Sequence, residues 1–125
     1  MKLLITGSRE ASQRLLHLAY KAVERCKKLG WEIIVGDAPG IDSAVIRACD
    51  DLGVPVEVHG AYNKIRNATK TGENVTHNTS YPGRDRIMAS KCDQCLALWN
   101  GKSRGTKITF ELVEMLGKKV NVIKV

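Results

Sequence analysis

The chain alternates short apolar runs with longer segments in which apolar residues recur every three or four positions. The short runs have the length and composition of buried β-strands and cover residues 2–6, 31–35, 54–59, 95–99 and 119–125. The longer segments have the period of helices with one buried face. They predict helices over residues 11–29, 41–52, 83–91 and 105–117. In the last helix, the spacing places on the buried face Ile108, Leu112, Met115 and Leu116.

The regular alternation of strands and helices predicts an α/β fold. A strand, a helix and a second strand form the unit that builds a parallel sheet covered on both faces. Right-handed crossovers then give a Rossmann-like three-layer sandwich with a five-stranded, mostly parallel sheet in the order 3-2-1-4-5. A length of 125 residues predicts one domain over residues 1–125.

Residues 60–80 interrupt this pattern, because they are polar and their apolar residues follow neither the period of a strand nor that of a helix. A loop of this length inside a compact domain is usually functional or disordered. Two interpretations stay open. The segment is a mobile flap beside a ligand site, or it is an insertion without defined structure.

Three of the predicted strands end in short polar loops that contain glycine and lead into a helix. In a parallel sheet such loops converge at the carboxyl edge, where α/β folds bind ligands. Free backbone N–H groups and positive helix ends at that edge suit a phosphate. The residues of these loops and helix starts expected to bind the ligand are Gly7, Ser8, Arg9, Gly36, Asp37, Ala38, Gly40, Asp42, Gly101, Ser103, Gly105 and Thr106. A fourth segment adds Arg84, near the start of the predicted helix over residues 83–91. Arg84 and Arg86 diverge around that helix, so one is expected to reach the ligand and the other to pair with an acid.

Two familiar phosphate motifs are absent from these loops. After the first strand, only Gly7 is present where the dinucleotide fingerprint requires three glycines. Gly101-Lys102-Ser103 resembles the end of a Walker A loop, but Leu96 occupies the position of its first glycine. The loops therefore predict a phosphate site of another kind.

Composition and charge narrow the class of protein. Apolar residues make up 43% of the chain, which is enough for a core, and no apolar run reaches the length of about 18 residues that a membrane span requires. Met1 leads directly into a strand, so we expect a cytoplasmic protein without membrane contact. The net charge of +7 favours an anionic partner such as a nucleotide or nucleic acid, although a solvated basic surface explains it equally well.

The four cysteines are expected to be structural. Cys92 and Cys95 form a C-x-x-C pair, but a second pair of metal ligands is missing, and the pair does not precede a helix as a redox pair would. We therefore predict no metal and no resident cofactor.

Taken in order, the motifs resemble the SLOG superfamily. They are Gly7-Ser8-Arg9, Gly36-x-Ala38-x-Gly40-Ile41-Asp42, Tyr81-Pro82-x-Arg84-x-Arg86-Ile87-Met88-Ala89 and Ser103-x-Gly105-Thr106. The resemblance spans nearly the whole chain and is greatest to small, stand-alone YspA/YpsA-like proteins. It implies a nucleotide or a nucleotide-derived phosphorylated ligand at the sheet edge. Because the superfamily includes the Rossmann-like domain of DNA-processing protein A, single-stranded DNA is an alternative partner. We also expect a homo-oligomer.

The resemblance implies an enzymatic alternative as well. Lonely Guy phosphoribohydrolases cleave an N-glycosidic bond with an arginine and with a glutamate that follows a Gly-Thr loop. Arg84 and Glu111 are the matching catalytic candidates, and the glutamate nucleophile of nucleoside deoxyribosyltransferases also resembles Glu111. The spacing differs, since Thr109 stands three residues after Thr106, where the Lonely Guy pattern has its glutamate.

Overall fold

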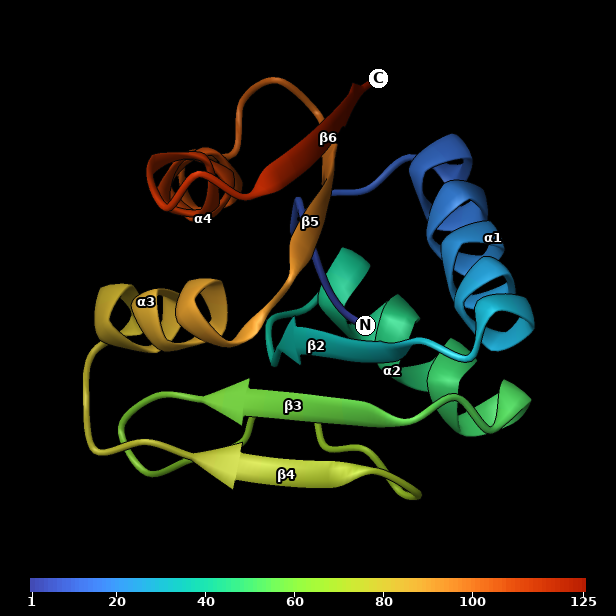
Figure 1. Cartoon of the computed structure of the whole chain (residues 1–125), viewed down its shortest axis with the longest axis horizontal. Helices are drawn as coiled ribbons and strands as arrows, with labels where there is room; N and C mark the ends of the chain where they lie inside the picture. Colours follow the sequence, from blue (N-terminus) through green and yellow to red (C-terminus); the bar gives the residue numbers. More distant parts are fainter.

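The computed structural model describes residues 1–125 as a parallel β-sheet between two layers of helices (Figure 1). The sheet has six strands in the order β4-β3-β2-β1-β5-β6, and every neighbouring pair is parallel. This confirms the α/β class and the order predicted for five of the strands. The elements are β1 (Lys2–Gly7), α1 (Gln13–Leu29), β2 (Glu32–Gly36), α2 (Ile41–Leu52), β3 (Val56–Gly60), β4 (Glu73–Thr76), α3 (Tyr81–Lys91), β5 (Gln94–Trp99), α4 (Arg104–Met115) and β6 (Lys119–Lys124).

The sixth strand, β4, lies inside the segment that the sequence predicted to be irregular. It pairs with β3 at the edge of the sheet, with Glu57 beside Glu73 and Gly60 beside Thr76. Its residues are exposed or half-buried, so no apolar alternation marks it in the sequence. The expectation of five strands is therefore wrong by one, because residues 73–76 of this segment form a strand.

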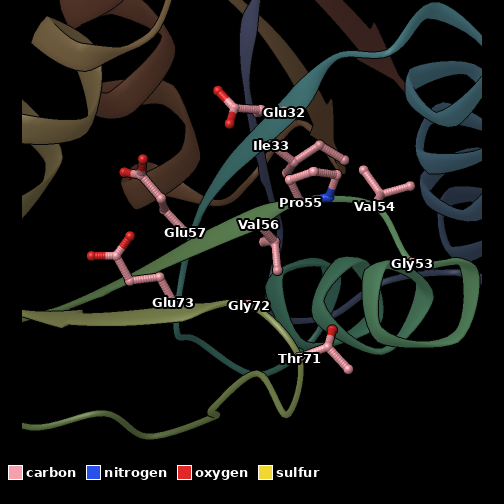
Figure 2. A pocket seen from close by; sticks show the side chains of 10 residues that line it. All are labelled: Glu32, Ile33, Gly53, Val54, Pro55, Val56, Glu57, Thr71, Gly72 and Glu73. Atoms are coloured by element: carbon pink, nitrogen blue, oxygen red, sulfur yellow. The ribbon is translucent and has the colours of Figure 1, made fainter.

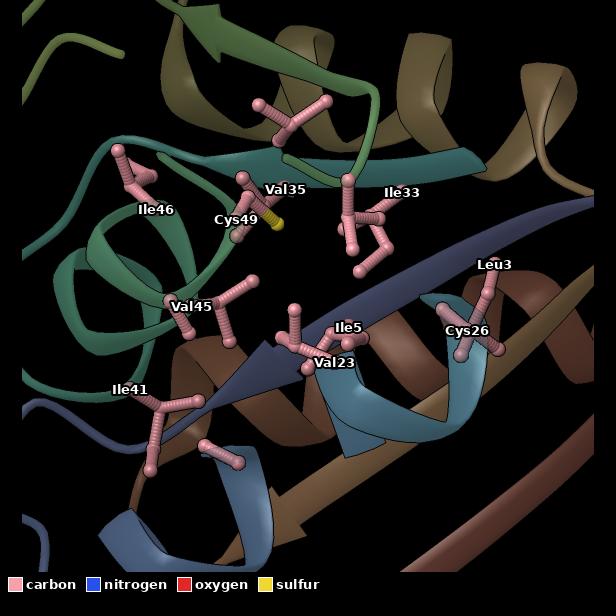
Figure 3. Close-up of a cluster of buried hydrophobic side chains, with 14 of the residues drawn as sticks. Leu3, Ile5, Val23, Cys26, Ile33, Val35, Ile41, Val45, Ile46 and Cys49 are labelled. Atoms are coloured by element: carbon pink, nitrogen blue, oxygen red, sulfur yellow. The ribbon is translucent and has the colours of Figure 1, made fainter. Parts of the chain in front are cut away.

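Alternate residues of the central strands enter two cores, one on each face of the sheet. On one face, Ile5 and Val35 pack against α1 and α2 in a cluster of 17 buried residues (Figure 3). On the other face, Leu4 and Ile34 pack against α3 and α4 in a cluster of nine. This two-sided burial explains why the central strands read as continuous apolar runs. The sheet is thereby held rigid beneath the loops at its carboxyl edge.

The helix α4 packs on a different face from the one that the spacing predicted. Its buried residues are Thr106, Thr109, Phe110 and Val113. By contrast, Ile108, Met115 and Leu116 are 47%, 82% and 53% exposed. The predicted inward face is therefore wrong for these three residues, whereas Leu112 is partly buried against the second core. The apolar spacing did not reveal the packed face because two of its positions are threonines. The displaced apolar side chains remain on the surface.

The cysteines belong to the cores. Cys26 and Cys49 lie in the first cluster, and Cys92 and Cys95 lie in the second. Burial raises the pKa of Cys26 to about 11 and, with smaller effects of neighbouring charges, that of Cys49 to about 12. The thiols are protonated at neutral pH and unreactive.

None of the helices has the length and apolar content needed to cross a membrane.

Candidate functional site

A polar pocket of about 150 Å³ opens at the carboxyl edge of the sheet, where the sequence predicted a site. Residues from β1, β2, α2, α3 and α4, together with the loops between them, form its wall. Predicted ligand-binding residues that line it are Gly7, Arg9, Gly36, Ala38, Asp42, Arg84, Ser103, Gly105 and Thr106. The structure thus brings together in space four motifs that are far apart in sequence.

Arg84 is the central charged group of this pocket. Its side chain is only 8% exposed, yet the guanidinium is held on two sides by carboxylates. Nη1 donates to Asp37 Oδ1 at 3.0 Å and to the carbonyl oxygen of His59 at 2.9 Å, and Nε donates to Asp85 Oδ1 at 2.8 Å. Nη2 has no hydrogen-bond partner in the protein. Every fully buried polar side-chain atom of the protein does have a partner, so Nη2 is accessible to solvent. One face of a fixed guanidinium is therefore available to a ligand.

Asp37 supports the pocket from below and does not line it. It is 1% exposed and accepts hydrogen bonds from the backbone N–H, Nε and Nη2 of Arg66, at 2.8, 3.2 and 2.8 Å. Burial opposes ionisation of Asp37, but the bonds from Arg66 and the charge of Arg84 outweigh it and lower its pKa. Asp37 therefore stays ionised and fixes the position of Arg84.

Glycine at position 36 is required by this arrangement. A Cβ atom there would lie 2.8 Å from Asp42 Oδ2 and 3.1 Å from Arg84 Nη1. At position 7, a Cβ atom would lie 2.5 Å from Cβ of Ile41. Gly7 and Gly36 end β1 and β2, so the missing side chains let α2 and Arg84 close over the strand ends.

Two buried carboxyl groups, Asp42 and Asp85, also line the pocket. Burial raises the pKa of Asp42 to about 7, against the hydrogen bond from Ala38 N–H at 3.1 Å and the charge of Arg84. Burial also raises the pKa of Asp85, although Arg84 opposes the shift. Near neutral pH, Asp42 is therefore present in both protonated and ionised forms and can accept or donate a hydrogen bond.

The first turn of α4 provides the hydroxyl groups of the pocket. Ser103 is the N-cap: its Oγ accepts from Thr106 N–H at 3.4 Å and lies 3.0 Å from Thr106 Oγ1. No atom lies within 4 Å of the position that a Cβ of Gly105 would take, so the helix end is open. The start of α2 differs, because its Ile41 N–H bonds the carbonyl oxygen of Ser8 at 3.1 Å and Asp42 places a carboxyl group there. Of the two helix starts, only that of α4 suits an anion.

The remaining predicted residues lie around the pocket without lining it. The Ser8 hydroxyl is fully buried and accepts from Asn100 N–H at 3.0 Å. Gly40 has φ 84° and lies against the backbone of Ser8 and Arg9, and Gly101 has φ 80° and lies beside Lys124. These three residues shape the loops, since positive φ favours glycine and a buried hydroxyl ties two loops together.

Glu111 lies outside the pocket. It is exposed on α4, whereas Thr109 of the same helix is buried and faces the pocket. Residues two apart on a helix point in different directions, so no carboxylate of α4 reaches the site. The catalytic role predicted for Glu111 finds no support at this pocket.

Sequence reasoning did not assign five residues of the wall: Thr6, Tyr81, Asp85, Met88 and Thr109. Tyr81, Asp85 and Met88 stand within the motif around Arg84, and their helical spacing of three and four marks a shared face. Thr109 stands where the Lonely Guy pattern has its glutamate. Thr6 left no signal, because it ends an apolar strand.

A larger cavity of about 410 Å³ lies at the starts of β2, β3 and β4, at the opposite edge of the sheet. Figure 2 shows the carboxyl groups of Glu32, Glu57 and Glu73 on one side of it and Thr71 at the other end. Glu57 is bound to Lys2, His59 and Lys91 at 3.2, 3.0 and 2.7 Å. The acidic wall offers no donors to a phosphate, so we assign the site to the smaller pocket. No cluster of His, Cys, Asp or Glu in the protein is arranged to hold a metal ion.

Solved structures share this architecture over nearly the whole chain. The molybdenum cofactor binding protein of the phototrophic bacterium Rippkaea orientalis matches with a TM-score of 0.87 and 15% identity, over 99% of this chain and 76% of its own. The molybdenum cofactor carrier protein of Chlamydomonas reinhardtii matches with a TM-score of 0.77 and 17% identity, over 97% of this chain and 74% of its own. The chain therefore shares the fold of these proteins, as its resemblance to the SLOG superfamily implies.

The same fold occurs in DNA processing protein A of Helicobacter pylori, which binds single-stranded DNA. Its TM-score is 0.78 at 15% identity, over 98% of this chain and 64% of that protein. No protein-family model and no curated protein sequence matches the chain. These matches confirm the resemblance to SLOG proteins at the level of the fold, and they are compatible with a ligand-binding site at the sheet edge.

Proposed function

We propose that this protein binds a nucleotide or a nucleotide-derived phosphorylated ligand in the pocket at the carboxyl edge of the sheet. The observation that carries the proposal is Arg84, which lines the pocket and whose guanidinium is fixed by Asp37 and Asp85 while Nη2 has no partner in the protein. An arginine held in this way donates to an anion without losing much conformational freedom. The cost of ordering it is already met by folding.

The two ends of the proposed ligand are expected to bind different groups. A phosphate is placed at the start of α4, where Ser103, Gly105 and Thr106 provide hydroxyls and an open helix end, with Arg9 at the rim. A sugar hydroxyl is placed near Asp42, whose carboxyl group can accept or donate. The division follows the charges, since a carboxyl group repels phosphate and accepts from hydroxyls.

Isothermal titration against a panel of phosphorylated compounds tests the proposal. The panel contains nucleoside monophosphates, cyclic and ADP-ribose-type nucleotides, ribose 5-phosphate and the molybdenum cofactor. Arg9→Gln is expected to weaken binding roughly tenfold, because hydrogen bonds to charged groups contribute about 1.5–3 kcal/mol. Arg14→Gln removes the same charge from an exposed position on α1 and should leave the affinity unchanged.

Arg84 gives a second comparison within one helix. Arg84→Met should abolish binding, whereas Arg86→Met, at an exposed position two residues away, should not. Circular dichroism of both variants separates lost binding from lost folding. If the folded wild type binds no member of the panel, the proposal is wrong.

Single-stranded DNA is the second candidate partner. It is favoured by the structural match to DNA processing protein A of Helicobacter pylori and by the net charge of +7. Electrostatic binding of this kind loses affinity steeply as salt rises. An oligonucleotide that is not retained even at low salt would remove this candidate.

The N-glycosidase alternative has lost its predicted carboxylate, because Glu111 lies outside the pocket. Release of base from a nucleoside monophosphate by the wild type would restore it. In that case Glu111→Gln is expected to react as fast as the wild type.

A cytoplasmic location stays a prediction.

We also infer that the chain self-associates through the exposed apolar side chains of α4. Ile108, Met115 and Leu116 are exposed, and Leu112, Met115 and Leu116 line a hollow of about 260 Å³ together with Ala89 of α3. Contiguous apolar surface of this kind marks interaction sites. A second copy of the chain is the proposed occupant.

A further inference from the structure

Tyr62 is a large aromatic side chain left exposed at the carboxyl end of β3. The residue follows β3 by two positions, and it is 57% exposed. Because all strands are parallel, this end of β3 lies at the same edge of the sheet as the pocket. An exposed tyrosine at a ligand-binding edge offers an apolar ring face at small conformational cost.

The backbone holds Tyr62 in an unusual conformation. Tyr62 and Asn63 have φ values of 53° and 54°, in the left-handed region that residues other than glycine rarely adopt. Two hydrogen bonds fix the turn: Tyr62 N–H donates to Thr79 O at 2.8 Å, and Asn63 N–H donates to His77 O at 3.0 Å. The ring is therefore presented by an anchored turn and not by a loose loop.

The exposed ring adjoins the wall of the pocket. Tyr62 meets Tyr81 edge to face, with ring centroids 5.4 Å apart and an angle of 83°. Tyr81 lines the pocket and lies beneath the guanidinium of Arg66, whose Cζ is 4.4 Å from the ring centroid. Since Arg66 is bound to Asp37, the same buried carboxylate positions both Arg84 and this aromatic rim.

The size of the pocket requires a second contact region for any ligand as large as a nucleotide. Its volume is about 150 Å³. Sites for small molecules and cofactors usually measure about 300–1,000 Å³. A phosphorylated sugar fits the scale of this pocket, and the rest of a larger ligand must extend over the rim.

We propose that Tyr62 is the stacking platform for a planar heteroaromatic ring that is joined to the phosphorylated part of the ligand. The inference rests on the proposed function, and it narrows the ligand class to compounds with both a phosphate and such a ring. Because Tyr62 contacts Tyr81 of the pocket wall, the ligand's ring is expected to extend from the pocket across Tyr81 toward Tyr62. A base stacked on an aromatic side chain gains affinity with little dependence on its identity.

The test compares adenosine 5′-monophosphate with ribose 5-phosphate, which lacks the ring. Wild type is expected to bind the nucleotide more tightly. Tyr62→Asn should reduce the affinity for the nucleotide by roughly five- to a hundredfold, the range measured for single base–aromatic stacks. It should leave the affinity for ribose 5-phosphate unchanged. Asn is chosen because it tolerates positive φ, so the turn is kept.

Two further variants make the outcome decisive. Tyr62→Phe keeps the ring and should bind as the wild type does. Tyr20→Asn makes the same change at an exposed tyrosine in the middle of α1, and it should also bind as the wild type does. Equal nucleotide affinity of Tyr62→Asn and wild type would overturn the inference and leave the phosphate site standing. If wild type binds neither compound nor any other of the panel, the proposed function fails, and the inference fails with it.

Discussion

At the scale of single residues, the site depends on atoms that are absent as much as on those present. Gly36 lets Arg84 and Asp42 approach the end of β2, where a Cβ atom would lie against both side chains. Gly105 has no such neighbour, although it lines the same pocket. The two glycines therefore have different roles, which substitution can separate.

Gly36→Ala is expected to destabilise the protein and weaken ligand binding. Its Cβ would lie 2.8 Å from Asp42 Oδ2, and overpacking of this kind costs about 1–3 kcal/mol. Gly105→Ala is the matched control for folding, since alanine fits without contact and is favoured over glycine in a helix by up to about 1 kcal/mol. Urea denaturation measures both. Equal stability of Gly36→Ala and wild type would contradict the packing described here.

Asp42 should make stability fall as the pH rises. Its pKa is raised to about 7 in the folded protein from an ordinary value of 3.8, so between these values the folded state binds more protons than the unfolded state. Stability is then highest below about pH 4 and decreases up to about pH 7 for this group. Asp42→Asn is expected to remove that decrease, as unfolding curves from pH 4 to 8 would show. A pH dependence identical to that of wild type would refute the assignment.

At the scale of elements, one carboxylate organises the turn that leads into β4. Asp50 of α2 accepts from the backbone N–H groups of Lys70 and Thr71, at 2.9 and 3.2 Å, and from the hydroxyls of Thr69 and Thr71. Lys70 and Thr71 are exposed, so these hydrogen bonds hold the turn in place. An edge strand of four residues thus depends on a side chain of a helix.

Asp50→Asn is expected to loosen this turn and β4 without unfolding the sheet. An amide group accepts fewer hydrogen bonds than a carboxylate and carries no charge. Backbone amides of residues 70–76 should exchange with solvent faster, while those of β1 and β2 stay protected. Asp51→Asn removes the same charge from the exposed neighbouring position and should change the exchange rates of neither set of amides. Equal exchange in all three proteins would show that Asp50 does not hold the turn.

At the scale of the whole molecule, the sheet separates two surfaces. Its carboxyl edge carries the polar pocket, and the outer side of α4 carries exposed apolar side chains. Exposed apolar residues that cluster beside a hollow are typical of interaction sites, and the proposed self-association rests on this surface. The net charge of +7 opposes association, so any dimer must rely on this apolar surface.

Met115→Glu is expected to convert the proposed oligomer to a monomer. The side chain of Met115 is 82% exposed, so the substitution should not affect folding of the monomer. Light scattering after size exclusion measures the mass of each variant. Leu29→Glu places the same charge at an exposed apolar position at the end of α1 and should leave the mass unchanged. A monomeric wild type would contradict self-association.

Three features could be predicted from the sequence alone: the alternation of strands and helices, the order of five strands and the sheet edge at which the candidate site lies. These follow from local rules, because buried parallel strands are continuous apolar runs and their loops must converge. Gly7, Gly36, Arg84 and Thr106 could be placed at the pocket in this way, since each stands at or near the end of a strand or the start of a helix at that edge.

The side chains that face the pocket could not be predicted from local patterns. Asp37 and Asp42 stand five residues apart, yet one lies beneath Arg84 and the other in the pocket wall. Glu111 was placed outside the site by the rotation of α4, and β4 became a strand only because β3 offered an edge to pair with. Helix rotation and edge pairing are set by packing between segments that are distant in sequence, and the periodicity along the chain does not reveal that packing.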